Sequence, residues 1–513
     1  MKSKVITTIG KATVLLTLLT ILSKIIGLFR EMIYARNFGL TSQFDLFLVS
    51  AVIPIVINTS LVYLGQHYFI PAYNRAKLIS EEEAKNFFRT TFWIFIFGGI
   101  LLAVFLFFLS GIIVNIFLSS QSLQFQITGR EIFLLLLITI PVNAGMFIIV
   151  AYLQANFRFV YPAITQIIMN IILITLIITF TDIFEIFVLP LAFLIAYSSA
   201  FIIIIIPVRK IVNFNFSTIL SFKQKLTDIQ IIISLIFIEG LSLSYILIDR
   251  YFFGDIPPGS IAALNYALII FALPVSIFSI PLITTFFSKF SKSSLNDNEQ
   301  LEIDFKKAVK INIFILLPVS IVLLFWGDFF IQLFYQRGKF TAADTFLTHR
   351  ILQYYAVSLV FFSSYLVIVK LLYSVNKYKN VLIISVIAFV LKIIFNFTFV
   401  NTWQQNGLAL STSLVYIFLF IVGSFLVVKI LNIKNRYFLL VDILYFTINA
   451  IVSYSVSLIY SNAYSDHGIF GEISSLFVFI VVYIVNSILL SDEEFKIIKN
   501  SLNSFMVSKS STG

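Results

Sequence analysis

Residues 92–114 read FWIFIFGGILLAVFLFFLSGIIV, and none of them carries a charge. A helix needs about 20 mostly apolar residues to cross the hydrocarbon core of a membrane, so this run is long enough. Apolar runs of similar length recur along the whole chain. The pattern predicts an all-α, polytopic membrane protein.

The composition supports this prediction. The chain has 513 residues, of which 60% are hydrophobic and 12% are charged. A soluble domain carries about 25% charged residues, so this chain has too few to cover a surface that faces water. Its mean hydropathy of +1.02 is typical of a membrane protein.

The apolar runs predict about fourteen transmembrane helices. The predicted spans are 12–35, 44–70, 87–115, 131–154, 161–181, 184–207, 229–253, 260–288, 308–335, 345–373, 380–400, 405–430, 438–461 and 469–491. The pair at 161–207 is the easiest to miscount, because its turn at Thr181-Asp182 is short. Residues 1–22 lack a small-residue cleavage site, so we interpret them as part of a retained helix rather than a signal peptide.

Basic residues concentrate in alternate connections between these spans. About 25 Lys and Arg fall on one side and about seven on the other, and such an excess marks the cytoplasmic side. An even number of spans then places both termini in the cytoplasm. The basic connections contain Arg75, Lys77, Lys85 and Arg89; Arg158; Arg209, Lys210, Lys223 and Lys225; Lys289 to Lys310; Lys377 and Lys379; and Lys429, Lys434 and Arg436.

A weak internal repeat returns after about 215–220 residues. Arg36-Asn37-Phe38-Gly39 is echoed by Arg250-Tyr251-Phe252-Phe253-Gly254, and residues 153–158 are echoed by residues 372–377. We interpret this as two parallel six-helix lobes, residues 1–210 and 225–430, followed by a helix pair at 438–491.

Ionisable side chains at membrane depth mark candidate sites, since each costs at least about 2.5–3.5 kcal/mol unless it faces a cavity or a partner. Lys24 and Arg30 on the first helix are expected to line a cavity for an anionic headgroup. Arg36 is interpreted as an interfacial anchor. Asp45 is expected to pair with Arg30 or Arg36, and to position Arg30 and Lys24 for the headgroup. Asn58 and Gln66, eight residues apart, share a helix face and either contact the ligand or hydrogen-bond a neighbouring helix.

A second set of polar residues lies on later helices. Glu239 is in mid-span with Asp249 nearby, and a role in proton or cation coupling is the default expectation. Lys392 and Asn396 are one turn apart on the eleventh predicted helix. A lysine this deep needs a carboxylate, for which Glu239 and Asp249 are the candidates.

Other chemistries are not supported by the sequence. The chain has no cysteine, its three histidines lie far apart, and its basic residues are scattered, so neither a metal site nor nucleic-acid binding is predicted. Nucleotide-binding and hydrolase motifs are missing, and the longest connections are too short for a catalytic domain. We therefore expect no enzyme activity and no cofactor.

Several motifs resemble the MurJ (MviN) family of lipid II flippases, which belongs to the MOP exporter superfamily. The matching motifs are Ser23-Lys24-Ile25-Ile26-Gly27-Leu28-Phe29-Arg30, Ala35-Arg36-Asn37-Phe38-Gly39, Phe44-Asp45-Leu46-Phe47, Pro257-Pro258-Gly259-Ser260, Asn265-Tyr266-Ala267, Gly338-Lys339-Phe340-Thr341-Ala342-Ala343-Asp344 and Asn406-Gly407-Leu408-Ala409-Leu410-Ser411. The ordered set spans most of the chain.

The resemblance implies two six-helix lobes around a central cavity and a bacterial cytoplasmic-membrane location. It implies alternating-access transport of an undecaprenyl-diphosphate-linked disaccharide-pentapeptide from the inner to the outer leaflet. The last two helices would form a groove for the prenyl tail, and cell-wall synthesis proteins would be partners. Arg30 matches an arginine that is essential in the family, and Lys24 stands at another such position, where the family has arginine.

Two further family arginine positions fall on Asn58 or Thr59 and on Ile269, so the diphosphate site is expected to be less basic. Some members of the family bind sodium at positions that match Asp249, Lys392, Asn396, Leu408 and Thr412. Lys392 would replace that cation with its own ammonium group.

Lipid II is the favoured cargo, and three alternatives remain open. The first is a flippase for O-antigen or exopolysaccharide units. The second is a cation-coupled drug exporter of the same superfamily, and the third is a membrane scaffold that transports nothing.

Overall fold

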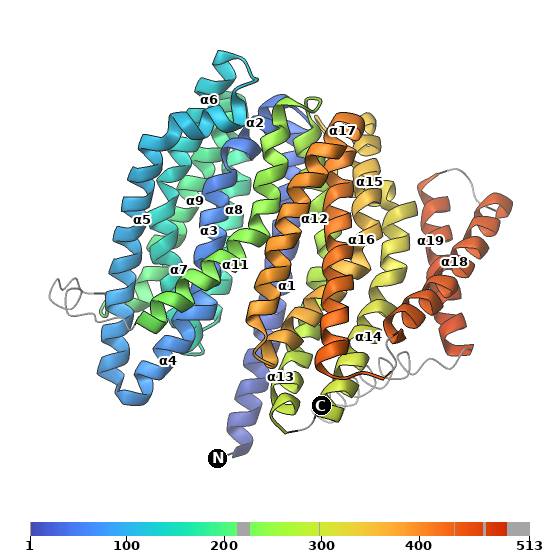
Figure 1. The fold of residues 1–513 in the computed structure, drawn as a ribbon. Coiled ribbons are helices and arrows are strands. Elements are labelled where there is room, and N and C mark those ends of the chain that lie inside the picture. The colour runs from blue at the N-terminus through green and yellow to red at the C-terminus, as the bar shows by residue number, and fades with distance from the viewer. Residues whose placement is uncertain (1, 213–225, 297, 435–436, 465–467, 490–513) are drawn as a thin grey trace. The chain divides into compact units, whose positions relative to one another are not determined.

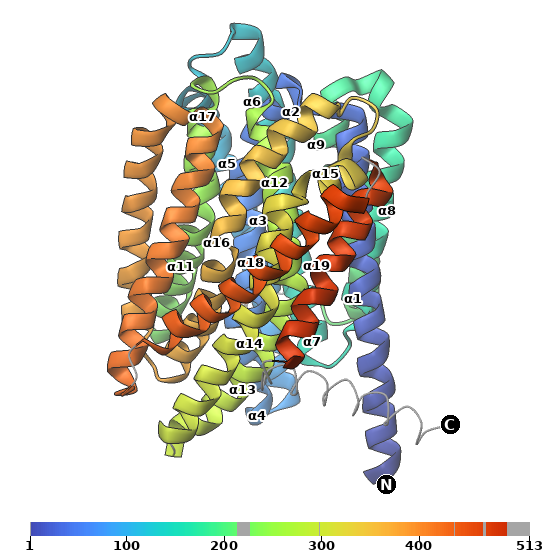
Figure 2. The same cartoon turned by 90° about the vertical axis from the view of Figure 1, so that its right-hand side faces the viewer.

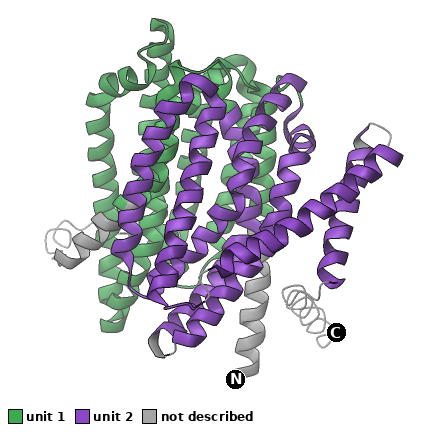
Figure 3. Cartoon of the chain, turned by 45° about the vertical axis from the view of Figure 1, so that its right-hand side comes forward, with its two compact units in different colours: residues 1–262, 337–341 green, residues 263–336, 342–513 purple. Residues whose placement is uncertain are grey.

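The computed structural model describes residues 2–212, 226–296, 298–434, 437–464 and 468–489. These residues form helices and connecting turns, without strands in the described ranges. The fold is therefore all-α, as the apolar runs predict. Two compact units are present, coloured separately in Figure 3: residues 1–262 with 337–341, and residues 263–336 with 342–513.

The first unit contains the helices of the N-terminal half of the chain (Figure 1). They are α1 (Lys2–Phe38), α2 (Ser42–Ser50), α3 (Val52–Leu64), the π-helix η1 (Gly65–Phe69), α4 (Ile70–Ile79), α5 (Glu81–Leu118), α6 (Leu123–Leu137), α7 (Thr139–Ala155), α8 (Val160–Phe184), η2 (Glu185–Phe187), α9 (Val188–Ile205), η3 (Ile206–Val208), α11 (Leu226–Tyr251) and η4 (Phe252–Gly254).

The second unit contains nearly all of the remaining helices. They are α12 (Ser260–Pro274), which begins in the first unit, the π-helix η5 (Val275–Ser279), α13 (Ile280–Asn296), α14 (Asn298–Phe325), α15 (Gly327–Tyr335), α16 (Ala342–Ser374), α17 (Tyr378–Ile430), α18 (Phe438–Tyr464) and α19 (Ile469–Leu489).

Nine helices of the described ranges are long and apolar enough to cross a membrane, or ten when the bent pair at residues 42–79 is counted as one span. Two of these, Val160–Val208 and Tyr378–Ile430, have 49 and 53 residues. A helix that crosses hydrocarbon once needs about 20 residues, so each is long enough for two of the predicted spans. Each contains a residue with positive φ, at Glu185 and at Gln404, where the helix breaks. The count of fourteen stays a prediction.

The first of these breaks lies later than the sequence suggests. The sequence predicts the turn at Thr181-Asp182, but α8 continues to Phe184 and Glu185 adopts φ 47°. The second break, at Gln404, falls within the predicted gap between residues 400 and 405. Hydropathy locates a short turn only to within a few residues, because its polar residues also fit a helix end.

Local backbone features recur with the spacing of the sequence repeat. After α7, Arg158 N donates to Leu153 O at 2.8 Å, and after α16, Lys377 N donates to Leu372 O at the same distance. Each helix is followed by a positive-φ residue, Phe157 and Asn376, which completes the same type of C-terminal cap. The two halves therefore share local geometry that their side chains barely reveal.

The predicted lobe limits, 1–210, 225–430 and 438–491, stay predictions. Helix α11, which the sequence assigns to the second lobe, belongs to the first compact unit and packs against α3. Residues 225, 490 and 491 of these limits lie outside the described residues.

Helix α5 illustrates how the sequence builds a long apolar helix. It begins after Ser80, whose Oγ accepts a hydrogen bond from Glu83 N at 3.0 Å, and its first turn carries three glutamates. Acceptors and negative charges at this end stabilise a helix N-terminus. Further along, Leu101 and Phe108 are 70% and 78% exposed, as expected of side chains that face lipid.

Helices α18 and α19 pack side by side in the second unit (Figure 2). Small polar side chains join them, because Asn449 donates to Ser487 at 3.0 Å and Ser457 donates to Ser475 O at 2.6 Å. Tyr483 of α19 donates to Phe314 O of α14 at 3.0 Å. Within a membrane, such hydrogen bonds and close packing hold helices together where lipid supplies little hydrophobic driving force.

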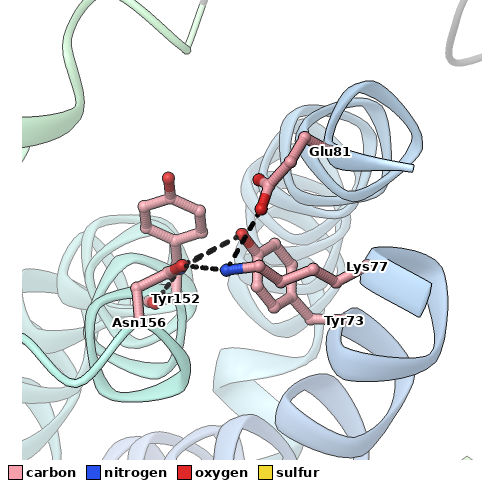
Figure 4. A network of polar contacts seen from close by, with 5 residues as sticks. All are labelled: Tyr73, Lys77, Glu81, Tyr152 and Asn156. Carbon is pink, nitrogen blue, oxygen red and sulfur yellow. Dashed lines mark hydrogen bonds and ion pairs between the residues drawn. The ribbon is translucent and has the colours of Figure 1, made fainter. Parts of the chain in front are cut away.

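A polar network joins two of the predicted basic connections (Figure 4). Lys77 Nζ donates to Asn156 Oδ1 at 3.1 Å and lies 3.4 Å from Glu81 Oε1. Asn156 Nδ2 donates to Tyr73 OH at 3.1 Å and to Tyr152 O at 2.9 Å. The end of α4 and the end of α7 therefore lie together, and the alternation of basic connections predicts that they are on the same side.

Candidate functional site

A cavity of about 830 Å³ lies within the first unit. Its walls come from α1, α3, η1, α7, α8, α9 and α11. The lining residues include polar side chains from most of these helices: Ser23, Lys24, Arg30, Asn58, Thr59, Tyr63, Gln66, Gln154, Thr165, Gln166, Tyr197 and Glu239. The helices that form this cavity are otherwise rich in apolar residues, so their polar side chains are concentrated at the cavity wall.

The two cations predicted to line a cavity do so. Lys24 and Arg30 both lie on α1 and both belong to the lining. The Arg30 guanidinium is fixed from three directions. Nη1 donates to Asn170 Oδ1 of α8 at 3.0 Å, Nη2 lies 2.6 Å from Glu31 Oε1, and the guanidinium carbon lies 5.5 Å from the centre of the Tyr34 ring. These contacts hold the guanidinium in place before any ligand arrives.

Asn58 and Gln66 also line the cavity, so the face that they were predicted to share points toward it. Asn58 is 7% exposed, and its Nδ2 donates to Thr139 Oγ1 of α7 at 3.3 Å. The interhelical hydrogen bond, one of the two alternatives for Asn58, is therefore present, and contact with the ligand stays a prediction. Its Oδ1 has no hydrogen-bond partner among the described residues.

Asp45 does not have the partner predicted for it. Its carboxylate accepts hydrogen bonds from Gly259 N at 2.6 Å and from Ala262 N at 2.7 Å. It is fully buried and forms no ion pair with Arg30 or Arg36, both of which are described. Asp45 caps the first turn of α12, where free N–H groups and the helix dipole favour a carboxylate. The predicted pairing is wrong because backbone donors far along the chain satisfy this side chain.

Glycines surround this capping contact. Gly39, Gly259 and Gly338 have φ of 55°, 85° and 58°. A Cβ on Gly259 would clash with Leu40 O, and one on Gly338 would clash with Arg36 O. The same segments are tied together by Lys339 N, which donates to Arg36 O at 2.9 Å. We call the segments 36–45, 257–262 and 337–341 the glycine junction.

The second predicted set is divided between the two units. Glu239 of α11 lines the cavity of the first unit, and Asp249 lies further along the same helix. Lys392, Asn396 and Thr412 lie on α17 in the second unit. The ion-coupling role of this set stays a prediction.

Lys392 is completely buried. Its Nζ donates to Leu408 O at 3.1 Å, to Ser411 Oγ at 2.9 Å and to Thr412 Oγ1 at 2.6 Å. Ser411 also donates to Asn396 Oδ1, and Asn396 is fully buried as well. A carbonyl and two hydroxyl oxygens are acceptors that suit the N–H donors of an ammonium.

An apolar groove of about 400 Å³ lies in the second unit. It is lined by residues of α12, η5, α14, α15 and α19, among them Leu273, Pro274, Phe278, Pro318, Val322, Phe330, Phe334, Leu476, Phe479 and Ile484. Helix α19 is the last of the two C-terminal helices that the sequence predicts. A groove with such a lining suits a hydrocarbon chain.

Sequence reasoning missed some residues that shape the cavity. Asn170 of α8 accepts a hydrogen bond from Arg30, and Tyr197 of α9 lines the cavity. Gln154 and Gln166 add amides to the wall. A signal for Asn170 was present, since it is an amide within a mostly apolar run. Tyr197 gave no such signal, because tyrosine is common in membrane helices.

Comparisons with known proteins assign the family. A family model described as the lipid II flippase MurJ matches residues 34–479. A probable lipid II flippase MurJ from Borreliella burgdorferi is 27% identical over 426 residues, which cover 82% of this chain and 83% of the relative. The lipid II flippase MurJ of Thermosipho africanus is 27% identical over 449 residues, which cover 85% and 90%.

Solved structures agree on the fold. The lipid II flippase MurJ in an inward closed conformation has a TM-score of 0.78 at 24% identity, with 93% of this chain and 99% of that chain covered. An inward-facing multidrug resistance MATE family transporter of the MOP superfamily has a TM-score of 0.65 at 15% identity, with 80% and 96% covered. The chain thus shares its fold with both structures, as the resemblance implies. The family model covers most of the chain, and the chain belongs to the lipid II flippase MurJ family.

Proposed function

We propose that this protein carries lipid II from the inner to the outer leaflet, with the headgroup in the cavity of the first unit. The observation that carries the proposal is a fixed arginine and a lysine in the wall of a polar cavity, within a chain of this family. The bacterial relatives and the nine or more apolar helices indicate a multi-pass protein of the bacterial inner membrane. The cytoplasmic location of both termini, and partners in cell-wall synthesis, are part of the proposal.

The physical chemistry of the cavity suits a diphosphate-sugar headgroup. Such a headgroup cannot cross hydrocarbon unaided, since each unsatisfied polar group costs several kcal/mol. Amides, hydroxyls and two cations in the wall replace its water. Moving a charge of about −2 outward gains roughly 4.6 kcal/mol per 100 mV of membrane potential. Transport then needs neither ATP nor a covalent step, so we propose no enzymatic activity.

The apolar groove of the second unit is proposed to hold the prenyl tail. Its lining is almost entirely hydrocarbon, and α19 contributes Leu476, Phe479, Ile480, Tyr483 and Ile484. Within the membrane the tail would leave lipid rather than water, so close packing against these side chains, and not the hydrophobic effect, would hold it. The polar headgroup and the apolar tail would therefore use chemically different surfaces of one protein.

Lys392 is proposed to make transport independent of sodium. Its ammonium donates to a carbonyl oxygen and to two hydroxyl oxygens, the kind of ligands that a sodium ion would need. Because the ammonium of Lys392 already occupies these oxygens, they do not fit a bound sodium ion as well. Replacing sodium by potassium in an assay of the purified protein should leave transport unchanged, and strict dependence on sodium would refute this part of the proposal.

Complementation tests the main function. The gene is expressed in a bacterium depleted of its own lipid II flippase, and growth is the expected result. An inactive protein with normal expression would contradict the proposal. Failure to grow together with altered surface polysaccharide would favour a flippase for O-antigen or exopolysaccharide units. Drug resistance without growth rescue would favour an exporter.

A further inference from the structure

The charges in the cavity do not all have the same sign. Three charged side chains are found in its described lining: Lys24, Arg30 and Glu239. A fourth, Glu31, lies behind Arg30 and contacts it at 2.6 Å. The formal charges of these four groups cancel, with +2 from Lys24 and Arg30 and −2 from Glu31 and Glu239. A cavity built for a purely anionic headgroup would have a positive sum.

The opposite charges lie on different walls. Lys24 and Arg30 belong to α1, which packs against α8 and is tied to it by the bond from Arg30 to Asn170. Glu239 belongs to α11, which packs against α3, and it lines the cavity together with Tyr63 of α3. One wall is therefore cationic and another is acidic.

Glu239 differs from Glu31 in lacking a protein partner. Glu31 is held by Arg30, whereas Glu239 forms no hydrogen bond or ion pair with the side chains and backbone that the structure describes. An ionised carboxylate at membrane depth is costly unless a cation or several donors meet it. Its place in the wall of the cavity would bring a cationic group of the ligand within its reach.

We propose that Glu239 binds an ammonium group on the transported headgroup, so that the cavity selects zwitterionic headgroups. The inference deepens the proposed function and rests on it. The diphosphate would lie at the wall with Lys24 and Arg30, and a free amine of the peptide part would lie at Glu239. Two charges bound at separate points also fix the orientation of the headgroup, which a single cationic patch would not do.

The selectivity has a physical origin in charge complementarity. Acetylation of the amine removes its positive charge and two of its three donors, which leaves Glu239 facing the headgroup without a counter-ion. Leaving a charge unpaired lowers binding affinity more in a partly desolvated site than at an exposed one. We expect the affinity for the acetylated headgroup to be lower by tenfold or more. Neutralising Glu239 itself should abolish the difference between the two forms.

The experiment measures binding of two forms of lipid II to the purified full-length protein. One form carries a free side-chain amine in its peptide, and the other carries the same amine acetylated. We expect the wild-type protein to bind the free amine about tenfold more tightly. Glu239→Gln should bind both forms alike, and Glu239→Asp, which keeps the charge, should retain a preference. Glu131→Gln makes the same charge change on α6, away from the cavity lining, and should behave as the wild type.

The outcomes separate this inference from the function it rests on. If the wild type binds neither form, the proposed function fails and the inference fails with it. If it binds both forms equally, lipid II binding stands and the inference is refuted, without reference to any variant. If Glu239→Gln weakens both forms by the same factor, Glu239 serves a small cation or the fold, and the inference is again refuted.

Discussion

The Arg30 guanidinium contacts a carboxylate, an amide and an aromatic ring, yet it still faces the cavity. Hydrogen bonds to charged groups contribute about 1.5–3 kcal/mol, so loss of the guanidinium that we propose to bind the diphosphate should be measurable. Arg30→Gln should lower lipid II affinity by about tenfold or more. Arg30→Lys should fall in between, since it keeps the charge and loses the planar fork.

The measurement is equilibrium binding of lipid II to purified variants, with melting temperature as a check on folding. Arg209→Ala serves as the control, because this arginine is exposed at the end of η3 and does not line the cavity. Equal affinity of Arg30→Gln and the wild type would mean that the diphosphate does not contact Arg30.

At the scale of elements, we expect a Gly→Ala substitution to destabilise the protein in the glycine junction and not at an open helix position. Gly259 has φ of 85°, and a Cβ there would clash with Leu40 O. Positive φ costs an alanine roughly 1–2 kcal/mol before any clash is counted, so Gly259→Ala should lower the melting temperature of the purified protein. Gly111→Ala is the control, since Gly111 lies inside α5 with no atom near the added methyl group. If the Gly259→Ala protein were as stable as the Gly111→Ala protein, the junction would not require glycine at position 259.

Elements are also the level at which sequence prediction works best. The long apolar runs locate the helices, because about 20 apolar residues in succession are rare outside a membrane. Lys24, Arg30 and Asn58 do line a cavity, since polar groups at membrane depth need one, and their contact with the ligand stays a prediction. The partner of Asp45 could not be predicted, because it consists of backbone N–H groups more than 200 residues away, which no side-chain pattern reveals. The bonds from Lys392 to the oxygens of α17 escape prediction because they depend on how the two halves of that helix pack.

At the scale of the whole molecule, the distribution of basic residues predicts which ends of the helices face the cytoplasm. The chain contains no cysteine, so a single introduced cysteine can be labelled without background. Glu82 lies beside the basic connection between α4 and α5, and Asp255 lies in the connection after η4. The two test variants are Glu82→Cys and Asp255→Cys. An impermeant thiol reagent added to intact cells should label the second and not the first. The reverse pattern would invert the proposed orientation.

The central claim is that this protein moves lipid II to the outer leaflet through the cavity that Arg30 lines. The most direct test counts lipid II molecules that an externally added lipid II-cleaving enzyme reaches in cells whose own flippase has been depleted. We predict that expression of the wild-type chain restores cleavage and that Arg30→Gln at equal expression does not. Lipid II that stays protected from the enzyme, despite normal amounts of the wild-type protein in the membrane, would contradict the claim.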